Sequence, residues 1–285
     1  MRAFTVLATG PLTTVQDAGR PGQAVLGIGR SGACDRASHR LANRLLGNPE
    51  GAAALEVTLG GLVLRACTGL YVVTTGARCA GPLPHNAPFL LRAGQEMRLG
   101  TPASGLRTYV AVCGGIDVAP VLGSRSTDIL AGLGPPIVSA GDVLPIGAPN
   151  PMPGVDIAPV GEPPDRELSV RLLPGPRCDW FSDTAWATLT GAAYKVSTNS
   201  NRVGLRLEGA PLHRAHTDEL PSEGMVRGAV QIPPSGQPVL FLADHPVTGG
   251  YPVIGYVTDG DIDACAQLRP GQSLRFRSRT TAPLE

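Results

Sequence analysis

Three stretches within residues 199–256 decide the fold: SNRVGLRLEG (200–209), ELPSEGMVRGAVQIPP (219–234) and LADHPVTGGYP (242–252). Each places a short, strand-like apolar run beside a turn rich in glycine, proline and polar residues. An ordinary solvated strand face would scatter its charges, whereas here they gather at the turns. This pattern is typical of polar clefts on β-scaffolds, so we predict a β-rich fold with a site built from turns.

The rest of the chain extends this pattern. Its 285 residues include 37 glycines and 28 prolines, with 4% aromatic residues, and no long segment keeps a 3.6-residue apolar period, which favours many short strands. Residues 145–164 contain seven prolines, typical of an extended connection. We therefore expect an N-terminal β-rich subdomain over 1–150, a proline-rich linker over 151–164 and a C-terminal subdomain over 165–285.

The clearest helix pattern is DRASHRLANRLLGNPE (35–50). Asp35 is placed to cap its start, leucines form an apolar stripe, and Gly47 is placed to end it. Residues 3–8 predict a first strand, and ALEVTLGGLVLRA (54–66) predicts two strands separated by a glycine pair. Residues 179–191 predict a short helix.

Charge and cysteine usage exclude several classes of partner. The formal net charge is +1 with acids and bases interspersed, so neither nucleic acid nor a membrane surface is indicated. No apolar run reaches the roughly 18 residues that span a bilayer, and we expect a soluble, cytoplasmic protein. The six cysteines form no CxxC pair, so we expect buried, reduced thiols and no metal site.

Lys195 is the one lysine of the chain. A Walker-type phosphate loop needs a Gly-Lys-Ser/Thr sequence, which is absent, and Lys195 lies in AAYKVST rather than in a biotin-carrier hairpin. If this chain binds ATP or biotin, it must therefore do so without a Walker-type loop or a carrier lysine. Otherwise ATP or biotin is bound by another chain.

Candidate site residues in the C-terminal half lie at the turns. Arg202 and Arg206 share a face if the segment is extended, and together they could clamp a carboxylate or phosphate; pairing with Glu208 and capping of a turn explain them equally well. Glu219 and Glu223 flank Pro221, where a carboxylate suits a base or a partner for an ammonium or ureido nitrogen, although two such acids are equally well explained as solvated.

Four further positions complete the C-terminal set. Gln231 is a neutral donor and acceptor suited to an amide-like ligand, although a lone glutamine is usually surface. Asp244 ends an apolar strand, and Gly249 and Gly250 free backbone N–H groups to face a ligand oxygen. His245, next to Asp244, points to the opposite strand face and is not expected to pair with it.

A second cluster lies in the N-terminal half, where Arg20, Asp35, Arg36 and His39 surround a long loop and the helix start, and Glu56 lies on a predicted strand. A helix cap for Asp35, a solvated His39 and a salt bridge for Glu56 explain them individually better than catalysis. Polar turns in both halves together suggest a cleft between the halves.

At this point the sequence resembles a known family. Its long, ordered motifs cover residues 5–277 and are LTTVQDAGRPG (12–22), residues 31–61, YVAVCGGIDVAPVLGSRSTD (109–128), PGPRCDWF (174–181), the three stretches above and AQLRPGQSLRF (266–276). They are similar to the biotin-dependent carboxyltransferase family, which contains the C subunit of 5-oxoprolinase, allophanate hydrolase subunit 2 and the carboxyltransferase region of urea carboxylase.

The resemblance implies a mainly β fold of two cyclophilin-like β-barrel subdomains with a few short helices. It implies that Arg202 holds an anionic group, that Glu223 or Asp244 handles proton transfer, and that the Gly249-Gly250 backbone stabilises oxyanion charge. It maps the remaining substrate-binding positions onto Arg20, Asp35, His39, Glu56, Asn201, Gln231, Thr248 and Tyr251.

The activity implied is that of one component in a complex that hydrolyses 5-oxoproline to glutamate with ATP. The partners implied are a homologous B subunit, an A subunit and a small amide or lactam substrate. ATP is expected at the level of the complex, on this or another chain, biotin is not expected to be covalently attached here, and this chain is expected to be inactive alone.

Two alternatives stay open. One is transfer to a urea-like substrate, as in allophanate hydrolase subunit 2 and related carboxyltransferases, with carboxybiotin from another chain. The other is a non-enzymatic regulator that sequesters a kinase inhibitor resembling the B subunit.

Overall fold

The computed structural model describes residues 1–154, 157–182, 184–216 and 218–278, and they form two compact units. Unit 1 comprises Met1–Gly22 and Arg30–Asp165, and unit 2 comprises Gln23–Gly29 and Arg166–Glu285. Strands dominate both, and the described residues contain three short α-helices, which confirms the mainly β class. The described residues of the predicted linker, 151–154 and 157–164, are grouped with unit 1.

Unit 1 contains two sheets, with strand orders β7-β4-β1-β9 and β2-β3-β8-β5-β6. The predicted strands at 3–8 and 54–66 are confirmed as β1, β3 and β4. The strands are β1 Ala3–Thr9, β2 Leu12–Gln16, β3 Ala54–Thr58, β4 Leu62–Ala66, β5 Leu70–Gly76, β6 Phe89–Leu91, β7 Glu96–Arg98, β8 Arg107–Val112 and β9 Val143–Pro145.

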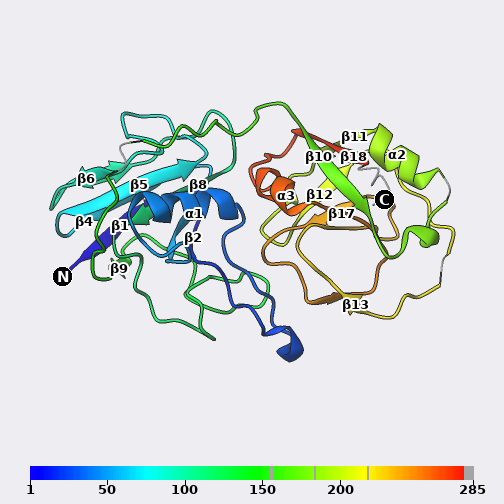
Figure 1. Ribbon diagram of the computed structural model, residues 1–285, viewed down its shortest axis with the longest axis horizontal. Helices are drawn as coiled ribbons and strands as arrows, with labels where there is room; N and C mark the ends of the chain where they lie inside the picture. Colours follow the sequence, from blue (N-terminus) through cyan, green and yellow to red (C-terminus); the bar gives the residue numbers. More distant parts are fainter. Residues whose placement is uncertain (155–156, 183, 217, 279–285) are drawn as a thin grey trace, which may run out of the picture. The chain divides into compact units, whose positions relative to one another are not determined.

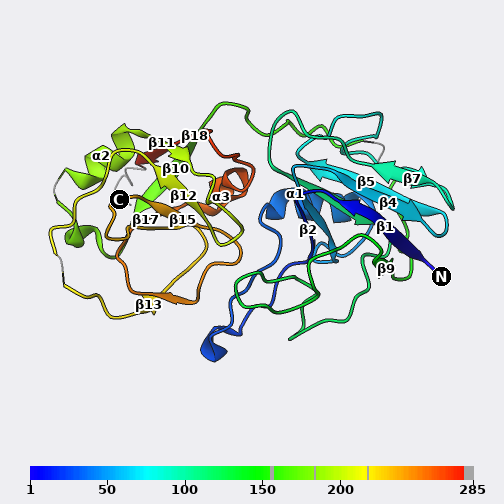
Figure 2. The same cartoon turned by 180° about the vertical axis from the view of Figure 1, so that it is seen from behind.

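The two sheets of unit 1 enclose one apolar core, to which Phe4 of β1, Leu64 of β4 and Val110 of β8 contribute. The second sheet is also covered on its other face, where Leu45 of helix α1 (Arg36–Leu45) packs with Ala111. Figure 1 shows α1 in front of these strands, and Figure 2 shows β1 and β4 from the opposite side. Strand β8 is therefore buried along its whole length, as expected of a strand covered on both faces.

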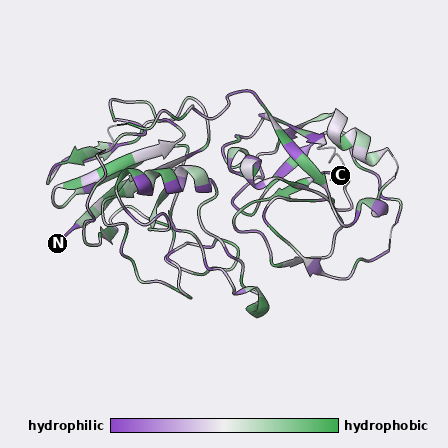
Figure 3. Cartoon of the chain, viewed as in Figure 1, coloured by the Kyte–Doolittle hydropathy of each residue, from purple (hydrophilic) through white to green (hydrophobic). Residues whose placement is uncertain are grey.

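Helix α1 forms where the sequence predicts it. Asp35 is its N-cap, and its Oδ1 accepts a hydrogen bond from the Ser38 backbone N–H at 2.9 Å. Gly47, with φ of 66°, follows the last turn in a left-handed conformation that only glycine adopts without strain. Figure 3 shows hydrophilic and hydrophobic residues mixed along α1, consistent with one face turned to the sheet.

Unit 2 is a closed barrel with strand order β10-β17-β14-β15-β12-β11-β18. Its first and last strands, β10 and β18, pair in parallel and close it. The strands are β10 Glu167–Pro174, β11 Ala193–Val196, β12 Gly204–Glu208, β14 Ala229–Gln231, β15 Val239–Phe241, β17 Val253–Val257 and β18 Ser273–Ser278. The expectation of a barrel in each subdomain is corrected for unit 1, whose strands form two sheets facing one core.

Short elements surround the barrel: η1 Ala24–Leu26, η2 Cys178–Trp180, α2 Ala185–Gly191, α3 Asp259–Cys265 and a two-stranded arm of β13 Glu223–Gly224 with β16 Thr248–Gly249. The helix predicted over 179–191 is shorter than expected. Phe181 is extended and bridges to Arg214, which separates η2 from α2.

The prediction that all cysteines are buried is wrong for Cys67, which is exposed, and for Cys79 and Cys178, which are half-buried. Cys67 directly follows the last residue of β4, where the chain leaves the core. Among the described residues, no helix has the length and apolar character needed to cross a membrane.

Candidate functional site

Glu56 is the centre of a buried polar network in unit 1. It lies on β3 and is 1% exposed. Its Oε2 accepts hydrogen bonds from the Tyr109 hydroxyl at 2.8 Å and from the Cys34 N–H at 2.9 Å, and its Oε1 lies 3.3 Å from Nε of Arg107. The Tyr109 oxygen in turn accepts from the N–H of Asp35 at 2.8 Å. Glu56 thus fixes the start of helix α1 against strand β8.

Burial raises the pKa of Tyr109 well above its usual range, and the nearby Glu56 charge adds to this effect. Tyr109 is therefore a neutral donor at physiological pH. The network fits the predicted salt bridge for Glu56 and the predicted cap for Asp35.

His39 is buried at 2% exposure, so the interpretation of it as a solvated residue is wrong. Its ring contacts Tyr109 edge-on, with centroids 6.0 Å apart, and Nε2 lies 3.4 Å from Nδ2 of Asn43. Burial is the largest effect on His39 and lowers its pKa. Backbone hydrogen bonds with Ala52 and Gln16 and nearby acids, including Asp17, act in the opposite direction but are smaller. The imidazole is therefore neutral at physiological pH.

One side of His39 lines a small cavity of about 160 Å³, which we call the His39 pocket. Its lining residues all belong to unit 1 and are Asp17, Ala18, Arg30, Arg36, His39, Arg40, Glu50 and Gly51. Three guanidinium groups against two carboxylates, one of them paired loosely with Arg40 at 3.9 Å, give the pocket a positive balance. A cavity of this size and charge suits a small anion such as a carboxylate or phosphate group.

Asp17 anchors the loop on one wall of that pocket. Its Oδ1 accepts hydrogen bonds from the hydroxyls of Ser124 and Ser126 at 2.7 and 2.6 Å, and its Oδ2 accepts from the Arg125 N–H at 2.6 Å. These bonds hold residues 124–126 against the loop after β2. Asp17 was not among the predicted site residues.

Arg20 lies apart from the His39 pocket lining, enclosed at 1% exposure. Its Nη2 donates to the Ser126 carbonyl at 2.5 Å, and its Nη1 is 3.8 Å from Oδ2 of Asp128. Among the described residues, Nε and Nη1 have no hydrogen-bond partner.

In unit 2, Arg202 and Asp244 bind each other. Nε and Nη2 of Arg202 donate to the two carboxylate oxygens at 2.9 and 3.0 Å, and both side chains are buried. The predicted clamp of Arg202 with Arg206 is wrong, because Arg206 is exposed on β12 whereas Arg202 lies in the preceding turn. Asn201 shapes that turn by accepting from the Val203 N–H at 2.8 Å.

Glu223 is the most accessible acid of the predicted catalytic set. It begins β13, its side chain is 26% exposed, and it is bound by Arg177, whose Nε donates to Oε1 at 2.9 Å. Hydrogen bonds from Arg177 hold the pKa of Glu223 below its usual range. Glu223 is therefore an anionic acceptor at neutral pH.

Several predicted residues lie together around the β13–β16 arm, and we call them, together with Arg177, which was not predicted, the Glu223 cluster: Arg177, Glu223, Gln231, Thr248, Gly249 and Tyr251. Glu223 pairs with Gly249 across the arm. Nε2 of Gln231 donates to the Tyr251 carbonyl at 3.1 Å and would lie 2.7 Å from a Cβ added at Gly249. A side chain at Gly249 would therefore displace the Gln231 amide.

The edge of this cluster is open to solvent. Thr248 and Gly250 are exposed, and the Tyr251 ring, 44% exposed, lies 5.4 Å from the Arg214 guanidinium. This contact is a cation–π pair that presents a flat aromatic surface beside the arm.

Sequence reasoning missed Tyr109, Arg107, Arg177 and Arg214 as members of these clusters. Tyr109 and Arg107 lie in an apolar strand, RTYVAV, and nothing in that pattern distinguishes them from core residues. Arg177 lies in PGPRCDWF, where a lone arginine between prolines and a cysteine gives no sign that it reaches Glu223. Among the described residues, no group of three or more His, Cys, Asp or Glu side chains is arranged to hold a metal ion.

Residues 26–278 match a family model described as carboxyltransferase domain, subdomain A and B. The chain is 38% identical over 283 residues to the C subunit of 5-oxoprolinase from Escherichia coli (strain K12), and the match covers 95% of this chain and 89% of that protein. It is 32% identical over 308 residues to urea amidolyase of Lachancea kluyveri, covering 96% of this chain and 17% of that protein.

A solved structure shares the fold. The crystal structure of TTHA0988 in space group P212121 has a TM-score of 0.88 and 37% sequence identity, and the match covers 98% of this chain. The chain spans 56% of the length of that solved chain.

Proposed function

Because the chain belongs to the carboxyltransferase domain family, subdomain A and B, we propose that it is the C subunit of a 5-oxoprolinase, a complex that hydrolyses 5-oxoproline to glutamate with ATP. The observation that carries this proposal is the similarity to the C subunit of the Escherichia coli 5-oxoprolinase, 38% identical and covering 89% of that protein. The urea amidolyase similarity is weaker and involves 17% of that protein, which supports a urea-type activity less well.

Two clusters carry the chemistry in this proposal. The His39 pocket, with arginines around a neutral imidazole, receives an anionic group of the substrate or of a phosphorylated intermediate. Glu223, held anionic by Arg177, accepts a hydrogen bond from a substrate nitrogen and is too weak a base to be the main proton acceptor at neutral pH.

Arg202 and Asp244 have a supporting role in this proposal. Each satisfies the other in a buried, bidentate pair, so neither is free to hold a ligand or to transfer a proton without breaking that pair. We place them as residues that position the turn before β12.

The partners proposed are a homologous B subunit and an A subunit, with ATP bound on another chain. Biotin is not covalently attached here, since Lys195 lies on strand β11 within the barrel and not on a hairpin tip. The chain alone is inactive, because neither cluster in its described residues includes a phosphate-binding loop. The location proposed is the cytoplasm.

The test is reconstitution. The chain is co-expressed with the A and B subunits of a 5-oxoprolinase, and release of glutamate and ADP from 5-oxoproline and ATP is measured. Activity should require all three chains. An assembled complex that leaves 5-oxoproline intact, while carboxybiotin and urea support turnover, would contradict the proposal in favour of the urea-type activity.

A further inference from the structure

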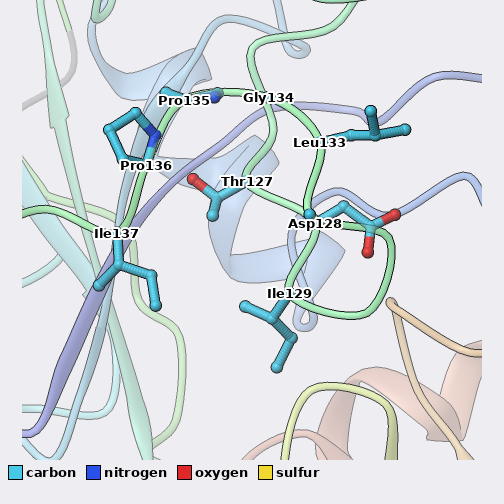
Figure 4. A pocket seen from close by; sticks show the side chains of 9 residues that line it. Thr127, Asp128, Ile129, Leu133, Gly134, Pro135, Pro136 and Ile137 are labelled. Atoms are coloured by element: carbon cyan, nitrogen blue, oxygen red, sulfur yellow. The ribbon is translucent and has the colours of Figure 1, made fainter.

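A second cavity in unit 1 offers little to a charged ligand. It has a volume of about 370 Å³ and is lined by residues between Thr127 and Ile137. Figure 4 shows the charged residue of this lining, Asp128, with its carboxylate turned away from Ile129 and Ile137. Unit 2 presents the opposite case, because a partly exposed cation stands there beside the Glu223 cluster.

That cation is Arg214, which has no acidic partner. In the part of the chain that the structure describes, no carboxylate oxygen lies within 4.0 Å of its guanidinium. The arginine of the cluster itself, Arg177, is by contrast paired with Glu223. The charge of Arg214 is thus balanced by no ion pair, and a partly buried cation in this state attracts an anion.

Arg214 is nevertheless fixed in place. Its Nη2 donates to the Ile232 carbonyl at 2.6 Å, and its guanidinium carbon lies 5.4 Å from the centre of the Tyr251 ring. Its Nε is buried and has no hydrogen-bond partner among the described residues, which is costly for a donor. An arginine that served only to solvate the surface would avoid this cost by turning its head group outwards. The fixed guanidinium is therefore explained by a ligand.

Tyr251 connects this cation to the Glu223 cluster. Its backbone carbonyl accepts from Nε2 of Gln231 at 3.1 Å, the Arg214 guanidinium lies over its ring, and the ring remains 44% exposed. The Gln231 amide in turn lies against Gly249, which pairs with Glu223 across the arm. A cation, an aromatic ring and an anionic acceptor therefore belong to one connected set of residues in unit 2.

The chemistry of this set specifies a ligand with two polar groups. Glu223, bound by Arg177, accepts an N–H group. The Arg214 guanidinium donates to a carboxylate, the planar acceptor that arginine matches best together with phosphate. The exposed Tyr251 ring offers a flat surface for the body of the ligand. A small ring that carries an N–H next to a carboxylate satisfies all three residues.

We propose that Arg214 determines specificity in the Glu223 cluster by binding the carboxylate of the ligand, while Glu223 accepts a hydrogen bond from the ligand N–H. Under the proposed function, on which this assignment rests, the ligand is 5-oxoproline. Its carboxylate is then held in unit 2, and the anion received by the His39 pocket is the phosphorylated group of the intermediate.

The probes are 5-oxoproline and 2-pyrrolidinone, which is the same ring without the carboxylate. Every residue of the proposed contact lies in unit 2, so binding to the full chain is measured directly, by ligand-observed NMR titration. The wild type should bind 5-oxoproline at least about tenfold more tightly than 2-pyrrolidinone, as expected for one charge-assisted hydrogen bond. Equal affinity for the two lactams would overturn the proposal, and so would an absence of 5-oxoproline binding.

Three variants locate the contact, each judged by the ratio of the two affinities, which a loss of folded protein does not change. Arg214→Gln keeps a donor for the Ile232 carbonyl without the charge and should bind the two lactams within about twofold of each other. Arg214→Lys keeps the charge and should retain a preference of about threefold or more. Arg206→Met, at an exposed arginine of β12, is the control and should keep the full preference. A preference that survives Arg214→Gln, or one lost as completely in Arg214→Lys, would overturn the proposal.

Kinetics of the reconstituted complex separate the role of Arg214 from the proposed function. Arg214→Gln should raise KM for 5-oxoproline about tenfold and change kcat by less than about twofold, because the carboxylate is bound equally in the ground state and the transition state. A wild-type KM in this variant would remove the role of Arg214 and leave the proposed function intact. A carboxylate preference that depends on Arg214, in a complex without oxoprolinase activity, would do the reverse.

Discussion

Glu56 in unit 1 and Glu223 in unit 2 are both acids of the predicted site, yet their surroundings differ. Glu56 is 1% exposed and is held by a tyrosine hydroxyl, a backbone N–H and Arg107. Glu223 is 26% exposed and is held by Arg177 on a two-stranded arm. The first acid organises the fold around it, whereas the second is accessible to a ligand or a partner chain.

The difference has an electrostatic origin. Charges in a protein interior interact strongly and are costly to leave unpaired, while exposed pairs are screened by water and salt. We therefore expect substitutions of buried groups to act on stability, and substitutions in the Glu223 cluster to act on activity. Four predictions test this contrast, in order of decreasing effect on stability.

The largest effect is expected in the buried pair of unit 2. Arg202→Met removes the bidentate ion-pair partner of the buried Asp244 carboxylate, which should lower the free energy of unfolding by about 3–5 kcal/mol. Urea denaturation measures it. The double variant Arg202→Met with Asp244→Leu should recover much of the loss, and a double variant as unstable as the single one would show that the pair is not the cause.

Tyr109→Phe tests the buried network of unit 1. The change removes one hydroxyl that both donates to Glu56 and accepts from the Asp35 N–H, so it should cost about 1–3 kcal/mol. Tyr71→Phe, at a 45% exposed tyrosine on β5, is the matched control and should be within about 0.5 kcal/mol of wild type. Similar costs for both would refute the buried role of Tyr109.

His39 should make stability depend on pH. Burial lowers its pKa in the folded state, so below the unfolded pKa of about 6.5 the unfolded chain takes up a proton that the folded chain resists. Stability is then lost as pH falls from about 6.5, by at most about 1.4 kcal/mol per pH unit from this residue.

The His39→Gln variant isolates this contribution. Its unfolding free energy should fall less between pH 7 and pH 5.5 than that of the wild type, measured by urea denaturation at each pH. His213→Gln, on an exposed histidine of unit 2, is the control and should keep the wild-type slope. Parallel curves for His39→Gln and wild type would contradict the prediction.

The smallest effect on stability is expected at Glu223. Glu223→Gln breaks a partly exposed ion pair and should change the unfolding free energy by less than about 1 kcal/mol. In the reconstituted complex it should lower kcat/KM at least about tenfold, the loss of one charge-assisted hydrogen bond. Glu219→Gln, an exposed acid four residues earlier, should leave both unchanged; equal loss of activity in both variants would remove Glu223 from the site.

The sequence predicted what depends on local pattern. The capped helix at Asp35 and the glycine-separated strands β3 and β4 follow from turns and alternation along short segments, whereas the grouping of Glu223, Gln231 and Gly249 came from the family resemblance. Partners contributed by distant segments could not be predicted. Arg177 reaches Glu223 across 46 positions, and the Arg202–Asp244 pair spans 42, so the alternation within one strand says nothing about either contact.

The order in which the two units are completed follows from their strand pairing. In unit 1, β9 pairs with β1, so all its strands have been synthesised by residue 145. In unit 2 the barrel closes through β10 and β18, so it stays incomplete until residue 278 has left the ribosome. During translation unit 1 has time to fold while β10 waits with an unpaired edge, the stage at which a nascent chain is most prone to misassembly. Chaperone dependence in the cell should therefore map to the barrel.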